Sequence, residues 1–383
     1  MRQRLIKLCF VYSVPVSEDR ADFLTHIPIR MKRMVSDKIE ISVLYNGTLN
    51  EEILMKHDIR VRKSRLSRIT QRFKYLQILF MAGEVFREAK KEDIDLFINA
   101  NNHYFLFAAA VGAKLAGKSV LARVTGIRPE RDNPTLAQRI RRKTSKILAR
   151  ISISLADKAI CLADYLKEKL IDDGVDPDKL IILSQGVDLS RFKIRKRNPD
   201  EEMETILYVG RLELTKGIEK ALEAFLLLKK RYQDLNFILC GEGSLKQKLV
   251  LKYGKVEGLS FLGHVAHDEI SSIYQKSDVL ILPSFSEGLS NVILEAMASG
   301  VAVIASNVGG NAQLLDFGQR GILIEPGSTG HIVSAVAQYI EDTAFFRECI
   351  QNGRDYVEKE HSFEVLSEYY LDLLKSICKT QGM

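Results

Sequence analysis

Short apolar runs alternate with longer amphipathic segments along almost the whole chain, and this alternation constrains the fold more than any other feature. The strand-like runs of the first half are LCFVYS, IEISVLY, DLFINA, SVLARV, KAICLA and LIILS. Segments such as RFKYLQILFMAGEVFREAKK lie between them, with apolar residues at helical spacing. The second half continues with TILYVG, NFILCG, LSFLG, DVLILPS, VAVIAS and GILIEP. Strand, helix and strand in this order predict parallel sheets that helices cover on both faces.

The chain length predicts two domains. A chain of 383 residues is too long for one ordinary core and suits two domains of about 150 to 200 residues each. The polar stretch RFKIRKRNPDEEMET separates the run LIILS from the run TILYVG. We therefore expect two Rossmann-like, doubly wound α/β domains that face a cleft, with residues 1–198 in the first and 199–362 in the second. An amphipathic helix is expected over 363–383.

The composition is that of a globular protein, because 46% of the residues are hydrophobic and 27% are charged. No apolar run approaches the roughly 20 residues that span a bilayer, and the run around Cys9 reads as a first buried strand. The five cysteines are scattered and form no C-x-x-C pair, which argues against a disulfide framework or a zinc site. These features predict a reducing, cytoplasmic setting.

The net charge of +7 is concentrated before about residue 200, which suggests an anionic partner. Residues 135–157 combine an apolar stripe with a basic stripe that consists of Arg139, Arg142, Lys143, Lys146 and Arg150. Such a helix can rest on the anionic inner face of a membrane as a peripheral protein does, or it can be an ordinary helix with a solvated face. No nucleic-acid partner is expected, since no recognised motif or aromatic platform accompanies the charge.

The segment VGRLELTKG follows the strand TILYV and leads into a helix. It places Gly210 at a turn and Arg211 and Lys216 near the helix start, beyond the carboxyl end of a strand, where open α/β sheets bind ligands. A guanidinium and an ammonium in this position can grip a phosphate with charge-assisted hydrogen bonds. The alternative is a pair of solvated charges.

The segment SFSEGLSNVILEAMASG follows the strand DVLILPS. Ser290 is a good N-cap and Gly300 a good C-terminal stop, so a short helix is expected between them. The backbone N–H groups of Ser290, Asn291 and Val292 would be donors at the helix start, where a diphosphate is favoured.

Two carboxylates then flank the predicted phosphate site, Glu287 before it and Glu295 more than one helical turn after it. Carboxylates accept paired hydrogen bonds from vicinal hydroxyls. Glu295 therefore suits a ribose diol and Glu287 a second sugar, which together with a diphosphate make a nucleotide sugar. The alternative is a loop charge and an exposed helix residue.

These residues carry a resemblance to a known family. The pattern E-G-x6-E followed by AMASG, the segment VGRLELTKG, and SQGVDLSRF at 184–192 resemble the motifs of the family-4 retaining glycosyltransferases, which have the GT-B fold. The resemblance implies that Arg211 and Lys216 neutralise the leaving diphosphate, that Glu295 binds the ribose, and that Glu287 contacts the donor sugar. It also implies a metal-independent reaction with no cofactor, and a C-terminal helix that crosses back to the first domain.

Other site residues are suggested by the same resemblance. It places the nucleotide base near Gly241, in the turn after NFILCG, and Thr125 at the position where many members carry a histidine. The family's V-G-G-x-x-E is VGGNAQ in this chain, with Gln313 in place of the acid. Asp93 and Asp95 form a D-x-D at the start of a strand, the wrong end for a ligand site, and are predicted to be structural.

The sequence thus predicts a glycosyltransferase of hexosyltransferase type. It would move a sugar from a nucleoside-diphosphate sugar to a glycan or lipid-linked acceptor in polysaccharide or lipopolysaccharide biosynthesis. Two alternatives are a sugar-nucleotide epimerase or phosphorylase-like enzyme on the same fold and a non-catalytic basic protein that binds a polyanion. Acceptor recognition is expected in the first domain.

Overall fold

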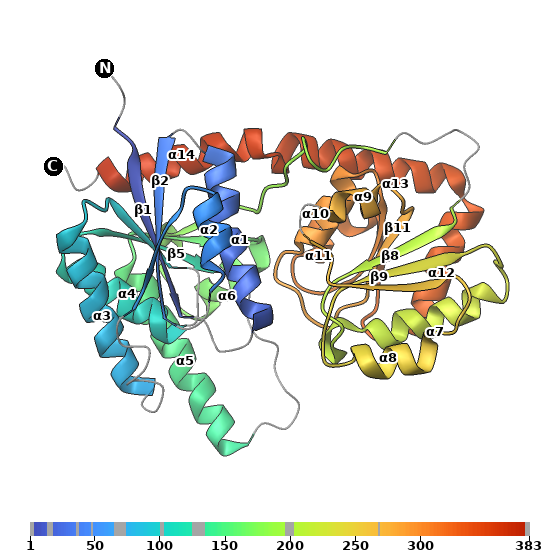
Figure 1. Ribbon diagram of the computed structural model, residues 1–383, viewed down its shortest axis with the longest axis horizontal. Helices are drawn as coiled ribbons and strands as arrows, with labels where there is room; N and C mark the ends of the chain where they lie inside the picture. The colour runs from blue at the N-terminus through green and yellow to red at the C-terminus, as the bar shows by residue number, and fades with distance from the viewer. Residues whose placement is uncertain are drawn as a thin grey trace. The chain divides into compact units, whose positions relative to one another are not determined.

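The structure is a computed structural model that describes residues 4–13, 18–35, 38–46, 49–64, 74–99, 103–124, 135–195, 203–266 and 269–379. It divides into two compact units, one formed by Met1–Leu183 with Leu366–Met383 and the other by Ser184–Val365. Each unit contains a parallel sheet with helices on its faces (Figure 1). The predicted fold class is confirmed.

The described part of the first unit contains a seven-stranded parallel sheet with the order β3-β2-β1-β4-β5-β6-β7. Its strands are β1 (Ile6–Ser13), β2 (Ile39–Asn46), β3 (Arg60–Lys63), β4 (Leu96–Asn99), β5 (Ser119–Val124), β6 (Lys158–Cys161) and β7 (Leu180–Ile182). Its helices are α1 (Glu18–Val35), α2 (Glu51–Lys56), α3 (Lys74–Lys91), α4 (His103–Leu115), α5 (Leu136–Leu155), α6 (Asp164–Asp172) and the 3₁₀ turn Pro177–Lys179. The helices α3, α4 and α5 pack side by side.

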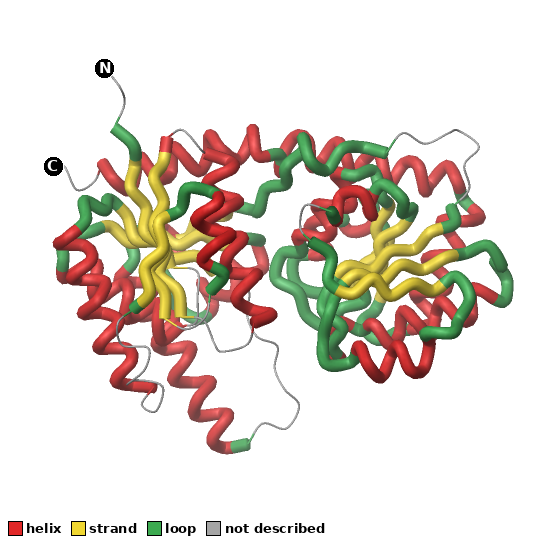
Figure 2. Tube along the Cα trace, in the orientation of Figure 1, coloured by secondary structure: helices red, strands yellow, loops and turns green. Residues whose placement is uncertain are grey.

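The described part of the second unit contains a six-stranded parallel sheet with the order β10-β9-β8-β11-β12-β13. Figure 2 shows the strands of this unit in yellow with its helices in red beside them. Its strands are β8 (Thr205–Val209), β9 (Asn236–Cys240), β10 (Leu259–Gly263), β11 (Val279–Leu282), β12 (Ala302–Ser306) and β13 (Ile322–Ile324). Its helices are α7 (Ile218–Lys229), α8 (Lys246–Tyr253), α9 (Ile270–Tyr274), α10 (Asn291–Ala298), α11 (Asn311–Leu314), α12 (Thr329–Glu341) and α13 (Thr343–Tyr356), with 3₁₀ turns at Leu214–Lys216 and Asp316–Gly318 and a π-helical turn at Val357–His361.

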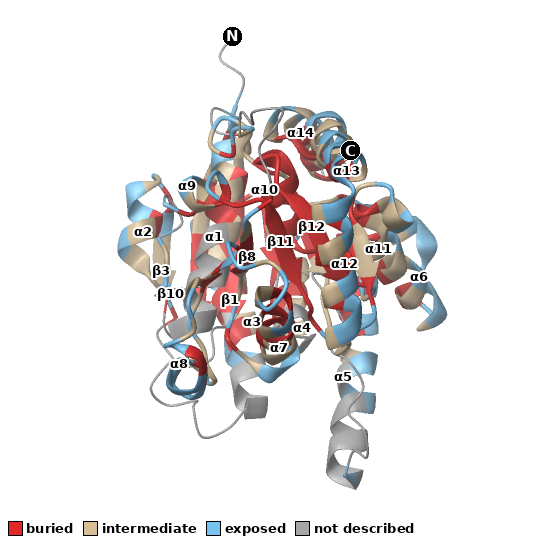
Figure 3. Ribbon diagram, turned by 90° about the vertical axis from the view of Figure 1, so that its right-hand side faces the viewer, coloured by how far each residue is buried: buried red, intermediate tan, exposed pale blue. Residues whose placement is uncertain are grey.

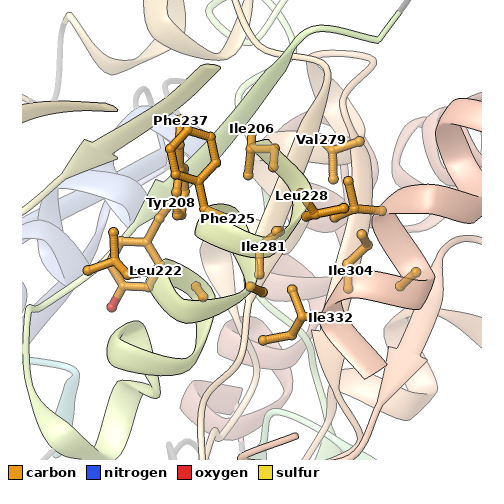
Figure 4. Packing of buried hydrophobic residues seen from close by; sticks show 14 of the residues in the cluster. Ile206, Tyr208, Leu222, Phe225, Leu228, Phe237, Val279, Ile281, Ile304 and Ile332 are labelled. Atoms are coloured by element: carbon orange, nitrogen blue, oxygen red, sulfur yellow. The ribbon is translucent and has the colours of Figure 1, made fainter. Parts of the chain in front are cut away.

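The centre of the second sheet is apolar on both faces, as expected of parallel strands that helices cover on each side. All four residues of β11 are buried, and Ile206 and Tyr208 of β8 lie beside Val279 and Ile281 in the same core (Figure 4). The helix α10 is buried over most of its length (Figure 3). A rigid core therefore carries the loops at the carboxyl ends of β8 and β11.

The C-terminal helix α14 (Phe363–Lys379) belongs mainly to the first unit, from Leu366 onward. Ser119 of β5 donates a hydrogen bond from its hydroxyl to the carbonyl of Ile377 at 3.3 Å. Leu366, Tyr370 and Leu374 are buried along one stripe of the helix. The predicted return of the helix to the first domain is confirmed.

The division between the units lies at Leu183/Ser184 and not at the predicted residue 198. Arg195 is the reason, because its guanidinium donates to the buried Asp278 carboxylate at 2.8 Å and its N–H donates to the carbonyl of Ser299. The beginning of the charged stretch 191–205 therefore already packs on the second unit. The prediction from charge alone placed the boundary too far along the chain.

The D-x-D motif has a structural role in the first sheet. Asp95 accepts the backbone N–H of Lys7 at 2.8 Å, and Arg4 donates to both Asp93 and Asp95. These contacts tie the start of β1 to the start of β4. The expectation of a structural pair is confirmed.

Candidate active site

The order of the second sheet reverses at β8, because β9 follows β8 in the chain on one side and β11 lies on its other side. In open parallel sheets the loops on the two sides of such a point diverge and leave room for a ligand at the carboxyl ends of the strands. The loop after β8 carries Gly210, Arg211 and Lys216, and the loop after β11 carries Glu287 and Ser290. The topology therefore brings the two predicted motifs to one edge.

The turn after β8 is tied to the turn after β9. The N–H of Gly210 donates to the carbonyl of Cys240 at 3.0 Å, and that of Leu212 donates to the carbonyl of Glu242 at 2.8 Å. Gly241 has a φ of 145°, and a Cβ there would lie 1.9 Å from the carbonyl oxygen of Gly210. Only glycine fits, so the two predicted glycines are in direct contact.

Arg211 follows this turn with its backbone held in place, since the buried hydroxyl of Tyr208 donates to the Arg211 carbonyl at 2.8 Å. Its guanidinium is half-exposed and donates to Glu213 at 2.5 Å. An exposed ion pair of this kind contributes little stability. An anion can therefore compete for the guanidinium at small cost.

Lys216 ends the 3₁₀ turn Leu214–Lys216 and is followed by Gly217, which is left-handed with a φ of 66°. A Cβ at Gly217 would lie 2.0 Å from the carbonyl oxygen of Pro283, so this glycine lets the turn lie directly against the end of β11. The close approach allows Lys216 Nζ to contact Glu287 Oε1 at 2.7 Å. The side chains of Lys216 and Glu287 are only 20% and 11% exposed.

This ion pair joins residues that the sequence separates by 71 positions. An ammonium has three donors, so Lys216 can hold Glu287 and still offer protons to an anionic oxygen. The carboxylate likewise keeps acceptor sites for a hydroxyl. The pKa of the nearby Tyr208 hydroxyl is raised far above its usual value. Burial is the main cause, and the negative charge of Glu287 adds to it.

The peptide at Glu287 is supported from the end of β12. Gly309 is left-handed with a φ of 57°, and a Cβ there would lie 2.0 Å from the carbonyl oxygen of Glu287. The N–H of Gly310 donates to the carbonyl of Gly288 at 2.8 Å. The VGG segment therefore positions the Glu287 turn.

The predicted short helix is α10, which begins at Asn291 after Ser290 and ends before Ser299 and the left-handed Gly300. Ser290 occupies the N-cap position with extended backbone angles, but its side chain makes no capping hydrogen bond. The first N–H groups of a helix have no acceptor within the helix, so Asn291 and Val292 can serve as donors to an anion.

Glu295 lies in the middle of α10 and is only 6% exposed, in contrast to the exposed helix residue that was the alternative. The hydroxyl of Tyr274 donates to Glu295 Oε2 at 3.2 Å. Tyr274 was not among the predicted site residues, because in the sequence it looks like an ordinary core aromatic before the strand DVLILPS. A buried tyrosine 21 positions before a predicted site acid carries no local signal.

The turn after β9 also carries Glu242, which accepts from Lys246 Nζ and from the backbone N–H of His264. The hydrogen bond from Lys246 is the main reason that the pKa of Glu242 is lowered. The loops after β8, β9 and β10 are thus linked to one another at the same edge of the sheet.

Thr125 lies outside the described residues. The predicted basic helix corresponds to α5, in which the Lys143 side chain is exposed and Lys146 pairs with Asp173 at 3.0 Å. The side chains of Arg139 and Arg142 are outside the described part. Among the described residues no helix is both long enough and apolar enough to cross a membrane.

Parallel sheets, a topological switch point, and a lysine–glutamate pair with a helix start at that point define a doubly wound α/β protein with a candidate ligand site at the edge of its second sheet. The profile of a family described as "Glycosyl transferases group 1" matches residues 190–356, and that of "Glycosyltransferase Family 4" matches residues 31–191. The chain belongs to the family-4 glycosyltransferases, with the GT-B fold.

Glycogen synthase of Mycobacterium tuberculosis is 30% identical over 200 residues, which are 51% of this chain and 48% of that protein. The capsular polysaccharide biosynthesis glycosyltransferase CapM of Staphylococcus aureus is 26% identical over 238 residues, 58% of this chain and 62% of CapM. The chain thus matches about half the length of the first of these relatives. The crystal structure of Anabaena HepE in complex with UDP matches this chain with a TM-score of 0.75 at 17% identity. The match covers 97% of this chain and 100% of the HepE chain.

Proposed function

We propose that the protein transfers a sugar from a nucleoside-diphosphate sugar to a glycan or lipid-linked acceptor, with retention of the anomeric configuration. The observation that carries the proposal is the contact of Lys216 with Glu287 at the switch point of the second sheet. In this proposal the lysine is the cation that neutralises the leaving diphosphate, and the neighbouring carboxylate contacts the sugar. The relatives' names support the class, since one is a glycogen synthase and one acts in capsular polysaccharide biosynthesis.

In this proposal the diphosphate lies against the N-terminus of α10 and contacts Arg211 and Lys216. Negative charge grows on the leaving diphosphate as the glycosidic bond breaks, and fixed cations with helix N–H groups stabilise that charge where it develops. The protein's own groups supply this stabilisation, so the proposed reaction is independent of a metal and of a cofactor.

The two acids bind the two ends of the donor. Glu295 accepts from the ribose diol, and Glu287, held by Lys216, accepts from hydroxyls of the transferred sugar. Gly210 and Gly241 let the turns after β8 and β9 lie in contact, because a Cβ at Gly241 would lie 1.9 Å from the carbonyl oxygen of Gly210; we propose that the nucleotide binds beside these turns.

A thermal-shift screen across UDP, ADP, GDP and their sugars tests the proposal. A ligand at 100 times its Kd adds about 2.7 kcal/mol to the free energy of unfolding. We expect a clear increase in the melting temperature with one of these nucleotides. No shift with any of them, or release of free epimerised nucleotide sugar in place of a transferred sugar, would contradict the proposal.

We also propose that the acceptor is met at an anionic membrane surface through α5. Ile147 and Ile151 are exposed on this helix beside Lys143 and Arg150, and a pocket of about 420 Å³ opens between α5 and the segment 174–176. Basic residues contribute about 1 kcal/mol each near an anionic surface, over a screening length of about 8 Å.

The membrane proposal is tested by sedimentation with vesicles of 30% phosphatidylserine. Replacement of Arg139, Arg142, Lys143 and Lys146 by Gln should reduce binding and its salt dependence, with nucleotide affinity unchanged. The control variant replaces four exposed lysines of the second unit, Lys230, Lys255, Lys276 and Lys359, by Gln. Equal vesicle binding by the two variants would rule out a specific role of α5.

A further inference from the structure

Tyr274 is the last residue of α9, and it is completely buried. A buried tyrosine hydroxyl needs a hydrogen-bond partner. This hydroxyl lies 3.2 Å from Glu295 Oε2 and 3.4 Å from the carbonyl oxygen of Val292. Both acceptors belong to α10, so one hydroxyl contacts the first turn of that helix and the acid one turn later.

The ring of Tyr274 is itself held in place. Phe192 packs edge-on against it, with ring centroids 5.8 Å apart and an interplanar angle of 75°. Phe192 is the last residue of the SQGVDLSRF segment, which is similar to a family motif but has no role in the proposed donor site. Arg354 donates from Nη1 to the carbonyl of Phe192 at 3.2 Å and also to the carbonyl of Ala298, the last residue of α10. Phe192 and α10 are therefore fixed to the same guanidinium.

We propose that Tyr274 is a positioning residue for Glu295 and thereby sets the affinity of the site for the ribose diol. The inference rests on the proposed function, because it needs Glu295 to bind ribose. A glutamate side chain has several rotatable bonds, and its carboxylate must be oriented to accept two hydroxyls at once. The carboxylate has about four acceptor sites, so the bond from Tyr274 leaves sites for the diol.

The chain of contacts runs from Phe192 through the Tyr274 ring and hydroxyl to Glu295. It gives the SQGVDLSRF segment a part in donor binding although the segment itself carries no proposed ligand contact. Tyr274 touches no substrate in this proposal, and its effect on the reaction passes through Glu295.

The test compares binding of the nucleoside diphosphate that the thermal screen selects with binding of its 2′,3′-dideoxy form, by calorimetry. Loss of a hydrogen bond to a charged group should weaken binding by about tenfold or more. For Tyr274→Phe we expect this loss for the natural nucleotide and no change for the dideoxy form. The donor KM should rise with kcat nearly unchanged, and Tyr274→Phe should add nothing in a Glu295→Gln background.

Tyr339→Phe is the matched control. Tyr339 is also completely buried in the second unit, and its hydroxyl donates to the carbonyl of Val303 at 3.1 Å. We expect this variant to lose stability without a change in the preference for the diol. Phe192→Leu keeps the Tyr274 hydroxyl but loosens the packing of its ring, and it should give a smaller loss of the preference for the diol. This variant replaces Tyr274→Phe in the test if Tyr274→Phe does not fold.

The outcomes separate the inference from the proposed function. If the wild type binds the two nucleotides equally, the ribose role of Glu295 fails, and the inference fails with it. If Glu295→Gln loses the preference for the diol but Tyr274→Phe and Phe192→Leu keep it, the inference alone is overturned. Equal weakening of both nucleotides by Tyr274→Phe would indicate a structural role only and would also overturn it.

Discussion

Replacement of Gly309 by Ala should slow sugar transfer while nucleoside diphosphate binding persists. The new Cβ would lie 2.0 Å from the carbonyl oxygen of Glu287 and 3.1 Å from that of Gly288. Ordinary contacts begin at 3.4 Å, so the Glu287 peptide must move by about 1.4 Å (3.4 − 2.0). This movement would displace the turn that contains Glu287, the proposed sugar-binding acid.

The size of the effect follows from this displacement. A misplacement of about 1 Å in a catalytic site can lower the rate about 100-fold. The left-handed φ of 57° costs an alanine about 1–2 kcal/mol of stability in addition. A domain with a free energy of unfolding of about 5–15 kcal/mol remains folded after such a loss. We therefore expect kcat to fall about 100-fold in a folded protein.

The assay measures sugar transfer by product chromatography and nucleoside diphosphate affinity by calorimetry. Gly330→Ala is the control, because Gly330 lies in α12, a Cβ added there would meet no atom within 4 Å, and the helix should accept alanine without strain. Wild-type kcat in Gly309→Ala would refute the role of the Glu287 turn. Loss of nucleotide affinity in proportion to kcat would refute the separation of the donor's two ends.

Two further predictions concern the acids and a buried histidine. Glu295→Ala should weaken binding of the bare nucleoside diphosphate and raise the donor KM, whereas Glu287→Gln should lower kcat strongly and leave bare nucleotide binding intact; equal loss of nucleotide affinity in both variants would contradict the assignment. Burial lowers the pKa of His361 below its ordinary 6.5, so the unfolded chain binds the proton more readily and stability should decline as pH falls below about 6.5. His361→Gln should weaken this dependence in melting curves from pH 5 to 8, and an identical pH dependence in the variant would count against the buried neutral histidine.

Local patterns in the sequence predicted every described strand of both sheets except β3, and the two ends of α10. The apolar runs correspond to strands in both units, and the N-cap position of Ser290 and the stop at Gly300 are those of α10. These signals are local, because strand and helix periodicity and helix ends depend on neighbouring residues. The strand β3 was missed, since RVRK at a sheet edge has a single apolar residue and no alternation that stands out.

The tertiary structure decided which distant residues meet. Strand order places β11 beside β8, and this neighbourhood brings Lys216 to Glu287 and Gly217 to Pro283. Tyr274 meets Glu295 because α9 packs against α10. A run of apolar residues specifies a buried strand but not the strand that lies next to it, so neither the ion pair nor the support of Glu295 has a signature in the sequence. The division of the units was decided in the same way, because the contact of Arg195 with Asp278 joins residues 83 positions apart and overrides the local charge pattern.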